Sequence, residues 1–272
     1  AAGPMAAEAI RLMTRGDREG FVAALDAGLD PNALALGKVR ILVIASRVGA
    51  VWAAEELLRR GADPNISGSD VLAHACAMED PSFAWRLLRE HGADPTLRRR
   101  GSRRTPLDNA VWWGHLELAR ELLDRGCPIS ERSMGILPGL GDIVHCPDGV
   151  WQDVGRLLLE RGADVTARDW SGASLIMHAA DFSEDIALFM LKAGADPSVI
   201  DLHGEYALQL AVCHRLEYLA DALARSELPT TDVERFLEVV RQWRWDRRGG
   251  LVLWREALSA GHSGAGASAA RG

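Results

Sequence analysis

The segment TPLDNAVWWGHLELARELLDRG (Thr105–Gly126) contains two short helical patterns separated by a Gly-His pair. Thr105 can cap the first helix, and Pro106 stands in its first turn, where a missing N–H loses no hydrogen bond. Leucine and alanine then recur at helical spacing over LELARELLDR (116–125), which predicts a second, amphipathic helix. Gly126 follows at the position of a left-handed C-cap. The segment therefore predicts two helices joined by a tight turn.

The end of this segment recurs along the chain at a nearly constant interval. A glycine and a short turn follow a leucine-rich stretch at Gly28, Gly61, Gly92, Gly126, Gly162 and Gly194. The steps between successive glycines are 33, 31, 34, 36 and 32 residues. A period near 33 residues indicates an array of stacked helical repeats.

The chain resembles the ankyrin repeat family. Thr105–Pro106–Leu107 and Gly114–His115 match the most recognisable motif of that family, although Asp108 replaces the usual His. DWSGASLIMHAA (169–180) and DLHGEYALQLAV (201–212) match more loosely, and ILPGLGDIVHCPDGVW (136–151) carries extra residues and two glycines where a first helix belongs. The resemblance implies an all-α, ankyrin-type helical repeat solenoid of about six to seven repeats with C-terminal capping helices.

Three regions are expected along the chain. Residues 5–228 form the ankyrin-like repeat array, 229–259 form C-terminal capping helices, and 260–272 form a flexible tail. TTDVERFLEVVRQWRW (230–245) predicts an amphipathic helix capped by Thr231. Arrays of this kind need a polar outer closure, so this helix is expected to cover the last repeat.

Composition places the chain among ordinary globular proteins. Apolar residues make up 48% and charged residues 25% of 272 residues. No stretch approaches the roughly 18 consecutive apolar residues of a membrane span, and the first ten residues lack the pattern of a secretory signal. The four cysteines form no CxxC pair and are expected to be buried and reduced; they are Cys76, Cys127, Cys146 and Cys213. A cytoplasmic protein is therefore expected.

The sequence contains no recognisable catalytic or metal-binding constellation. The eight histidines show no HxxxH or HExxH spacing, and neither GxSxG nor a phosphate-binding glycine loop occurs. Four aspartates that follow helix ends are expected to accept turn N–H groups instead; they are Asp63, Asp94, Asp164 and Asp196. We therefore expect no enzyme activity, no cofactor and no metal, with an enzyme of unrecognised site as the remote alternative.

Charge is distributed unevenly. Residues 133–229 carry 6 basic and 15 acidic side chains, whereas LRRRGSRR (97–104) is strongly basic. In the repeat register this basic stretch is a projecting turn, either simply solvated or recognising an acidic patch on a partner protein. The arginines assigned to it are Arg98, Arg99, Arg103 and Arg104. Nucleic-acid binding is disfavoured because the chain has a net charge of −7 and lacks an extended basic footprint.

Aromatic residues recur where the first helix of a repeat ends. Trp112 and Trp113 occupy the last turn of the first helix in the fourth unit, and an ankyrin-like stack would open this turn into a concave groove. Adjacent helical residues point about 100° apart, so burial of both rings is less expected than burial of one. Residues at corresponding places complete the expected binding set: Asp181 and Phe182 in the sixth unit, Trp170 on the hairpin before it, and Met78, Glu79 and Asp80 in the third unit.

The sequence thus predicts a non-catalytic protein that binds a partner protein through its concave face. An inhibitor or immunity-type protein that masks its partner is the sharper hypothesis. The alternative is an adaptor or substrate receptor that recruits other machinery through its C-terminal helices. The free chain is expected to be a monomer, with neither nucleic acid nor a membrane as partner.

Overall fold

The computed structural model describes residues 4–35, 39–66, 70–97, 104–130, 139–224 and 226. Over these ranges the chain consists of helices and turns, with isolated antiparallel bridges in place of strands. It divides into unit 1 (residues 1–164) and unit 2 (residues 165–272), and each is described by itself below. The regions expected to form capping helices (229–259) and a tail (260–272) lie outside the described residues.

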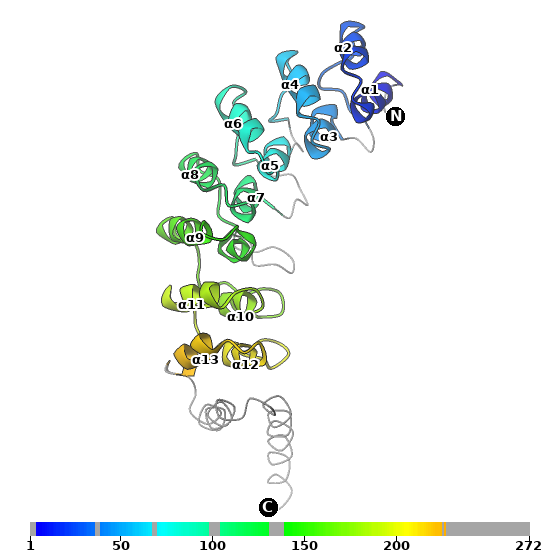
Figure 1. Cartoon of the computed structure of the whole chain (residues 1–272). Helices are drawn as coiled ribbons and strands as arrows, with labels where there is room; N and C mark the ends of the chain where they lie inside the picture. Colours follow the sequence, from blue (N-terminus) through cyan, green and yellow to red (C-terminus); the bar gives the residue numbers. More distant parts are fainter. Residues whose placement is uncertain are drawn as a thin grey trace, which may run out of the picture. The chain divides into compact units, whose positions relative to one another are not determined.

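Helix pairs follow one another along the described ranges of unit 1 (Figure 1). They are α1 (Pro4–Arg15) with α2 (Arg18–Asp26), α3 (Ile41–Arg47) with α4 (Val51–Arg59), α5 (Val71–Cys76) with α6 (Ser82–Arg89), α7 (Pro106–Trp112) with α8 (Leu116–Asp124), and the 3-10 helix η2 (Gly139–His145) with α9 (Trp151–Glu160). The first helices α1, α3, α5, α7 and η2 pack against one another in chain order. The second helices α2, α4, α6, α8 and α9 form the other layer (Figure 1).

The fourth pair folds as its sequence predicts. The hydroxyl of Thr105 accepts the N–H of Asp108 at 3.1 Å, and the Asp108 carboxylate accepts the N–H of Thr105 at 2.7 Å. This reciprocal capping box starts α7 with Pro106 in its first turn. Gly126 has a φ of 83°, which confirms the left-handed end of α8.

The turn between α7 and α8 requires glycine for two reasons. Gly114 has a φ of 70°, a backbone conformation that residues other than glycine adopt only with steric strain. A Cβ at this position would also lie 2.7 Å from Cδ of Pro147, which comes from the irregular fifth repeat. The glycine therefore allows the α7–α8 turn to pack closely against the chain that follows η2.

The core of unit 1 lies between the two helix layers. Leu107 on α7 and Leu122 on α8 are fully buried, as are Leu57 on α4 and Leu87 on α6. Leu57, Leu87 and Leu122 recur at the same place in successive second helices, so the leucine pattern that predicts amphipathic helices also supplies the packing. Each fully buried leucine contributes roughly 1.5–3 kcal/mol of transfer free energy.

Unit 2 contains α10 (Leu175–Ala180) with α11 (Glu184–Lys192) and α12 (Ala207–Cys213) with α13 (Glu217–Ala224). A short hairpin precedes each pair, closed by the bridges Arg168↔Ser174 and Ile200↔Tyr206. The N–H of Leu202 donates to the carbonyl of Ser171 at 2.8 Å and joins the two hairpins. The hairpins and the first helices α10 and α12 therefore lie on one side of unit 2.

Three of the four aspartates that follow helix ends have the structural role expected from their position. Asp63 accepts the N–H of Asn65, Asp94 accepts that of Thr96, and Asp196 accepts that of Ser198, each at 2.8–2.9 Å. A carboxylate that bridges its own turn in this way is a local structural element.

The cysteines agree with the sequence prediction at three of four positions. Cys76, Cys127 and Cys146 are buried, and none of the four is in a disulfide. The expectation was wrong for Cys213, which is exposed. It is the last residue of α12, where the chain turns and the inter-helix core has ended.

The helices of the described ranges are too short to span a lipid bilayer. The longest of them, α1, has 12 residues, whereas a spanning helix needs about 20, and none is apolar enough to qualify.

Candidate functional site

In four of the repeats, a residue one or two positions beyond the end of the first helix lies at the same distance from the N-cap. Eight residues after the N-cap positions Arg40, Asp70, Thr105 and Ser174, the chain carries the residues Val48, Met78, Trp113 and Phe182. Val48, Trp113 and Phe182 are exposed large apolar side chains. The repeat register thus places apolar groups at the edge of the first-helix layer in both units.

The two adjacent tryptophans have different environments. Trp112 is half-buried and stacks on the ring of His145 with centroids 3.5 Å apart. The guanidinium carbon of Arg104 lies 4.2 Å from the Trp112 ring centroid. Trp113 retains 39% of its accessible surface. Trp112 therefore packs against the neighbouring repeat, and Trp113 is the ring available to another molecule.

Arg104 is one of the four arginines assigned to the projecting basic turn. Its side chain is partly buried, and Nη2 donates to Oδ1 of Asp142 at 2.9 Å. The Asp142 carboxylate is buried, so a positive charge beside it is stabilising. Arg104 supplies that charge and therefore packs against η2. The other arginines of the proposed group, Arg98, Arg99 and Arg103, lie outside the described residues.

Two buried carboxyl groups accompany Arg104, and sequence reasoning did not identify them as a pair. Burial raises the pKa of Asp142 to about 7, Arg104 opposes this rise, and the nearby Asp108 carboxyl adds to it. Asp108 accepts the N–H of Thr105 and, at 2.8 Å, the hydroxyl of Ser130. The substitution of Asp108 for the His of the family motif was the available signal for this network.

The third unit supplies one apolar and two acidic residues. Met78 is half-buried, and His115 Nε2–H donates to its carbonyl oxygen at 2.8 Å. Glu79 and Asp80 are exposed. Asp80 accepts the N–H and hydroxyl of Ser82, and these hydrogen bonds lower its pKa. The Asp80 carboxylate therefore already stabilises the start of α6.

Unit 2 exposes four large apolar side chains on its hairpins and at the end of a first helix. Trp170 and Leu202 retain 70% and 79% of their accessible surface, and Ile200 and Phe182 are also exposed. We call Trp170, Phe182, Ile200 and Leu202 the unit 2 apolar surface. Ile200 and Leu202 were missed from the sequence, although Leu202 follows Asp201 as Trp170 follows Asp169, 32 residues earlier. The repeat register was the signal that could have found Leu202.

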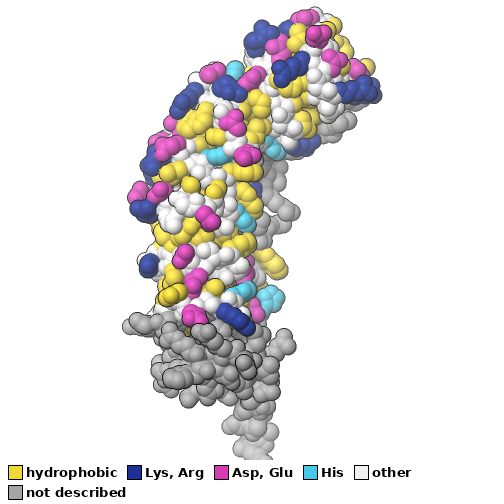
Figure 2. All heavy atoms as spheres, in the orientation of Figure 1, with side chains coloured by type: hydrophobic (Ala, Val, Ile, Leu, Met, Phe, Trp, Pro, Cys, Tyr) yellow, Lys and Arg dark blue, Asp and Glu magenta, His cyan; other side chains and the backbone are white. Residues whose placement is uncertain are grey.

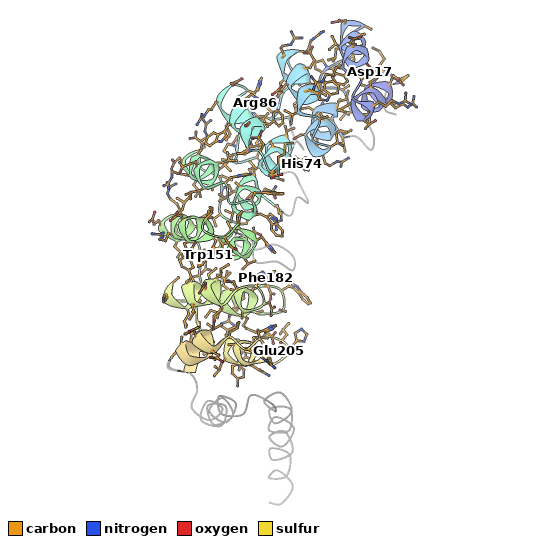
Figure 3. All side chains as sticks on the ribbon, in the orientation of Figure 1. Asp17, His74, Arg86, Trp151, Phe182 and Glu205 are labelled. Carbon is orange, nitrogen blue, oxygen red and sulfur yellow. The ribbon has the colours of Figure 1, made fainter. Side chains whose placement is uncertain are left out.

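Histidine and acidic side chains accompany this surface. Figure 3 labels Phe182 and Glu205 on the side of α10 and α12. The Phe182 ring lies 5.3 Å from that of His178, whose pKa is lowered by burial against the opposing influence of Asp181 and Asp169. Asp181 Oδ1 lies 3.1 Å from Nε2 of His214.

The second-helix side of unit 1 has a different character. Ion pairs join successive second helices: Arg60–Asp26 at 2.6 Å, Arg86–Glu55 at 2.5 Å and Arg161–Asp124 at 2.7 Å. Figure 2 shows basic and acidic side chains along this edge of unit 1. Exposed pairs of this kind contribute roughly 0–1 kcal/mol each, so they mainly keep this side polar.

The comparisons with known proteins agree with this architecture. Residues 42–133 match the family model for ankyrin repeats (3 copies). The crystal structure of the human ASB11 ankyrin repeat domain matches with a TM-score of 0.61 and 24% identity, over 84% of this chain and 100% of that chain. Residues 42–133 are therefore ankyrin repeats, and the chain has an all-α, ankyrin-type fold.

Ankyrin repeats are generally protein–protein interaction modules, and the family is typically non-catalytic. In the described ranges, no group of three or more His, Cys, Asp or Glu residues is arranged to hold a metal ion.

Proposed function

We propose that this chain is a non-catalytic protein that binds a partner protein through the face formed by its hairpins and first helices, which is the concave face in an ankyrin array. The observation that carries the proposal is the unit 2 apolar surface. Four large apolar side chains stand exposed there on the hairpins and at a helix end. Clustered exposed apolar groups of this kind mark interaction sites.

Unit 1 carries a proposed binding surface of its own. Trp113 is its aromatic anchor, and Met78 and Val48 hold equivalent positions in the preceding repeats. Trp112 precedes Trp113 in the chain, and contacts with Arg104 and His145 hold the Trp112 ring in place. Glu79 lies next to Met78 and supplies an exposed charge at the rim.

Arg98, Arg99 and Arg103 are proposed to attract an acidic region of the partner. Exposed charges act over about 8 Å at physiological salt and chiefly raise the rate of association. Replacing these three arginines with serine is therefore expected to slow association and to flatten its dependence on salt.

Photo-crosslinking in cells of the native source tests the proposed face. A photo-reactive amino acid at Trp170 or Trp113 is expected to capture the same protein. The same group at Tyr218, a 76%-exposed residue of the second helix α13, or at Trp85 on α6, serves as the matched control. Equal capture from the second-helix positions would contradict the proposed face.

Affinity measurements with the captured protein follow. The double variant Trp170→Ser, Phe182→Ser is expected to bind at least about thirtyfold more weakly, as for loss of about 2 kcal/mol at an interface hot spot. Tyr218→Ser is expected to bind normally. Unchanged affinity in the double variant would remove the unit 2 apolar surface from the binding site.

Within this class we propose a masking role, as in an inhibitor or immunity-type protein, for a cytoplasmic chain that is monomeric when free. Four cysteines outside any disulfide support a reducing compartment. The adaptor alternative assigns recruitment of a second protein to residues 229–259. Deleting residues 229–272 distinguishes the two, because an adaptor would lose the second protein while it keeps the first.

A further inference from the structure

The two hairpins of unit 2 present their apolar residues as one continuous strip. Asp169 Oδ1 accepts the N–H groups of Ser171 and Ala173, and Asp201 Oδ1 accepts those of His203 and Glu205, each at 2.8–3.0 Å. Trp170 and Leu202 follow these aspartates directly. The two hairpins therefore hold their apolar residues in the same conformation.

Neighbouring backbone segments keep the strip together. The hydrogen bond from Leu202 to the carbonyl of Ser171 joins the hairpins, and a Cβ on Gly172 would lie 3.7 Å from Cα of Asp201. Ile200 belongs to the same hairpin as Leu202. A ligand that binds here meets a surface fixed in advance, which lowers the entropic cost of association.

The carboxylates of this region differ in how many hydrogen bonds they already accept within the protein. Asp169 and Asp201 each accept two backbone N–H groups, so their charge is partly satisfied within the hairpins. Asp181 and Glu205 are exposed, and the Asp181 carboxylate pairs with the imidazole of His214. These two carboxylates supply the negative charge available to a ligand.

Positive charge is scarce in the same unit. Residues 165–224 contain nine acidic residues and three basic ones, Arg168, Lys192 and Arg215. Arg168 stands at the base of the first hairpin, where its charge adds to the hydrogen bonds from Ser198 that lower the pKa of Asp196. Lys192 ends α11, on the second-helix layer. A cationic ligand would therefore meet a net attraction at the apolar strip.

We infer that the unit 2 apolar surface binds an extended segment of a partner protein in which Lys or Arg residues alternate with large apolar side chains. This inference rests on the proposed function and specifies the chemistry of the partner. The apolar side chains of the segment cover Trp170, Ile200 and Leu202. Its cationic groups pair with Asp181 and Glu205, which adds selectivity and speeds association more than it adds affinity.

Selection of a random 12-residue peptide library on the full chain tests the inference. The enriched peptides are expected to combine Lys or Arg with Leu, Ile, Phe or Trp. Fluorescence anisotropy with one enriched peptide is then expected to show at least about tenfold weaker binding for Trp170→Ser, Leu202→Ser. The matched control is Tyr218→Ser on α13, which is expected to bind normally, and circular dichroism verifies that each variant is folded.

A second pair of variants tests the charge. Asp181→Asn, Glu205→Gln is expected to weaken binding at least about threefold at low salt, with the difference largely lost near 0.5 M NaCl because salt screens exposed charges. The control Asp185→Asn, Glu217→Gln removes two exposed carboxylates from the second helices α11 and α13. It is expected to change binding less than the test pair does.

The outcomes separate this inference from the proposed function. Enriched peptides that are acidic or uncharged, yet still need Trp170 and Leu202, would overturn the partner chemistry and leave the binding face intact. Peptides that bind all variants equally, or a selection that enriches none, would overturn the inference. In those cases the crosslinking experiment still decides the proposed function by itself.

Discussion

Replacing Trp112 with alanine is expected to destabilise unit 1, whereas the same change at Trp113 is expected to have little effect on stability. The Trp112 ring is held between the guanidinium of Arg104 at 4.2 Å and the imidazole of His145 at 3.5 Å. The His145 contact joins α7 to η2, and Arg104, which precedes the N-cap of α7, is itself paired with Asp142 of η2, so the loss affects the junction between the fourth and fifth repeats.

The magnitude follows from what the ring contributes at this site. Truncation of a fully buried tryptophan typically costs 3–5 kcal/mol, and a half-buried ring loses about half of this, or roughly 2 kcal/mol. The cation–π contact adds about 0.5–1 kcal/mol and the stacked pair about 0.5–1.5 kcal/mol. We therefore expect a loss of about 3–4.5 kcal/mol for Trp112→Ala, and less than about 1 kcal/mol for Trp113→Ala.

Urea unfolding followed by circular dichroism measures the loss, and hydrogen–deuterium exchange locates it. Exchange is expected to rise in α7 and η2 of the Trp112→Ala variant, and Trp112→Phe, which keeps an aromatic face, is expected to recover part of the stability. A Trp112→Ala variant as stable as the parent, or a larger loss for Trp113→Ala, would refute the assignment of Trp112 to packing.

Three further outcomes follow from the described contacts. Because burial raises the pKa of Asp142 to about 7, the folded chain keeps a proton that the unfolded chain loses near pH 4. The free energy of unfolding is therefore expected to fall as pH rises from about 4 to about 7, by at most about 1.4 kcal/mol per pH unit. Asp142→Asn should flatten this slope in urea titrations. Gly114→Ala should lower the melting temperature more than Gly49→Ala, because both sites have φ near 70° but only a Cβ at position 114 would meet Pro147. Equal decreases in melting temperature would exclude this clash. Cys213 should be the first of the four thiols alkylated in the folded chain, as peptide mapping will show, and faster labelling of any buried thiol would contradict the described burial.

The sequence predicts the helix pairs well because their determinants are local. The cap at Thr105, the left-handed Gly126 and the leucine stripe of α8 each depend on residues a few positions apart. The same periodicity places Trp113 and Phe182 at equivalent ends of first helices, and it would have placed Leu202 beside Trp170 if the hairpin register had been followed through.

Contacts between distant positions could not be derived in this way. Arg104 and Asp142 are 38 residues apart, and their ion pair forms because the irregular fifth repeat builds a 3-10 helix against α7. Its extra residues break the period that the prediction uses. The environment of Trp112 depends on the same junction, so the sequence identified the tryptophan pair but could not determine which ring is exposed.

Hydrogen–deuterium exchange of the chain with and without its purified partner tests the binding face most directly. Protection on binding is expected in the hairpins at 168–174 and 200–206 and at the ends of α7 and α10, with the second helices α8, α11 and α13 unchanged. Protection confined to these second helices, with the hairpins unchanged, would contradict binding through the hairpin and first-helix face.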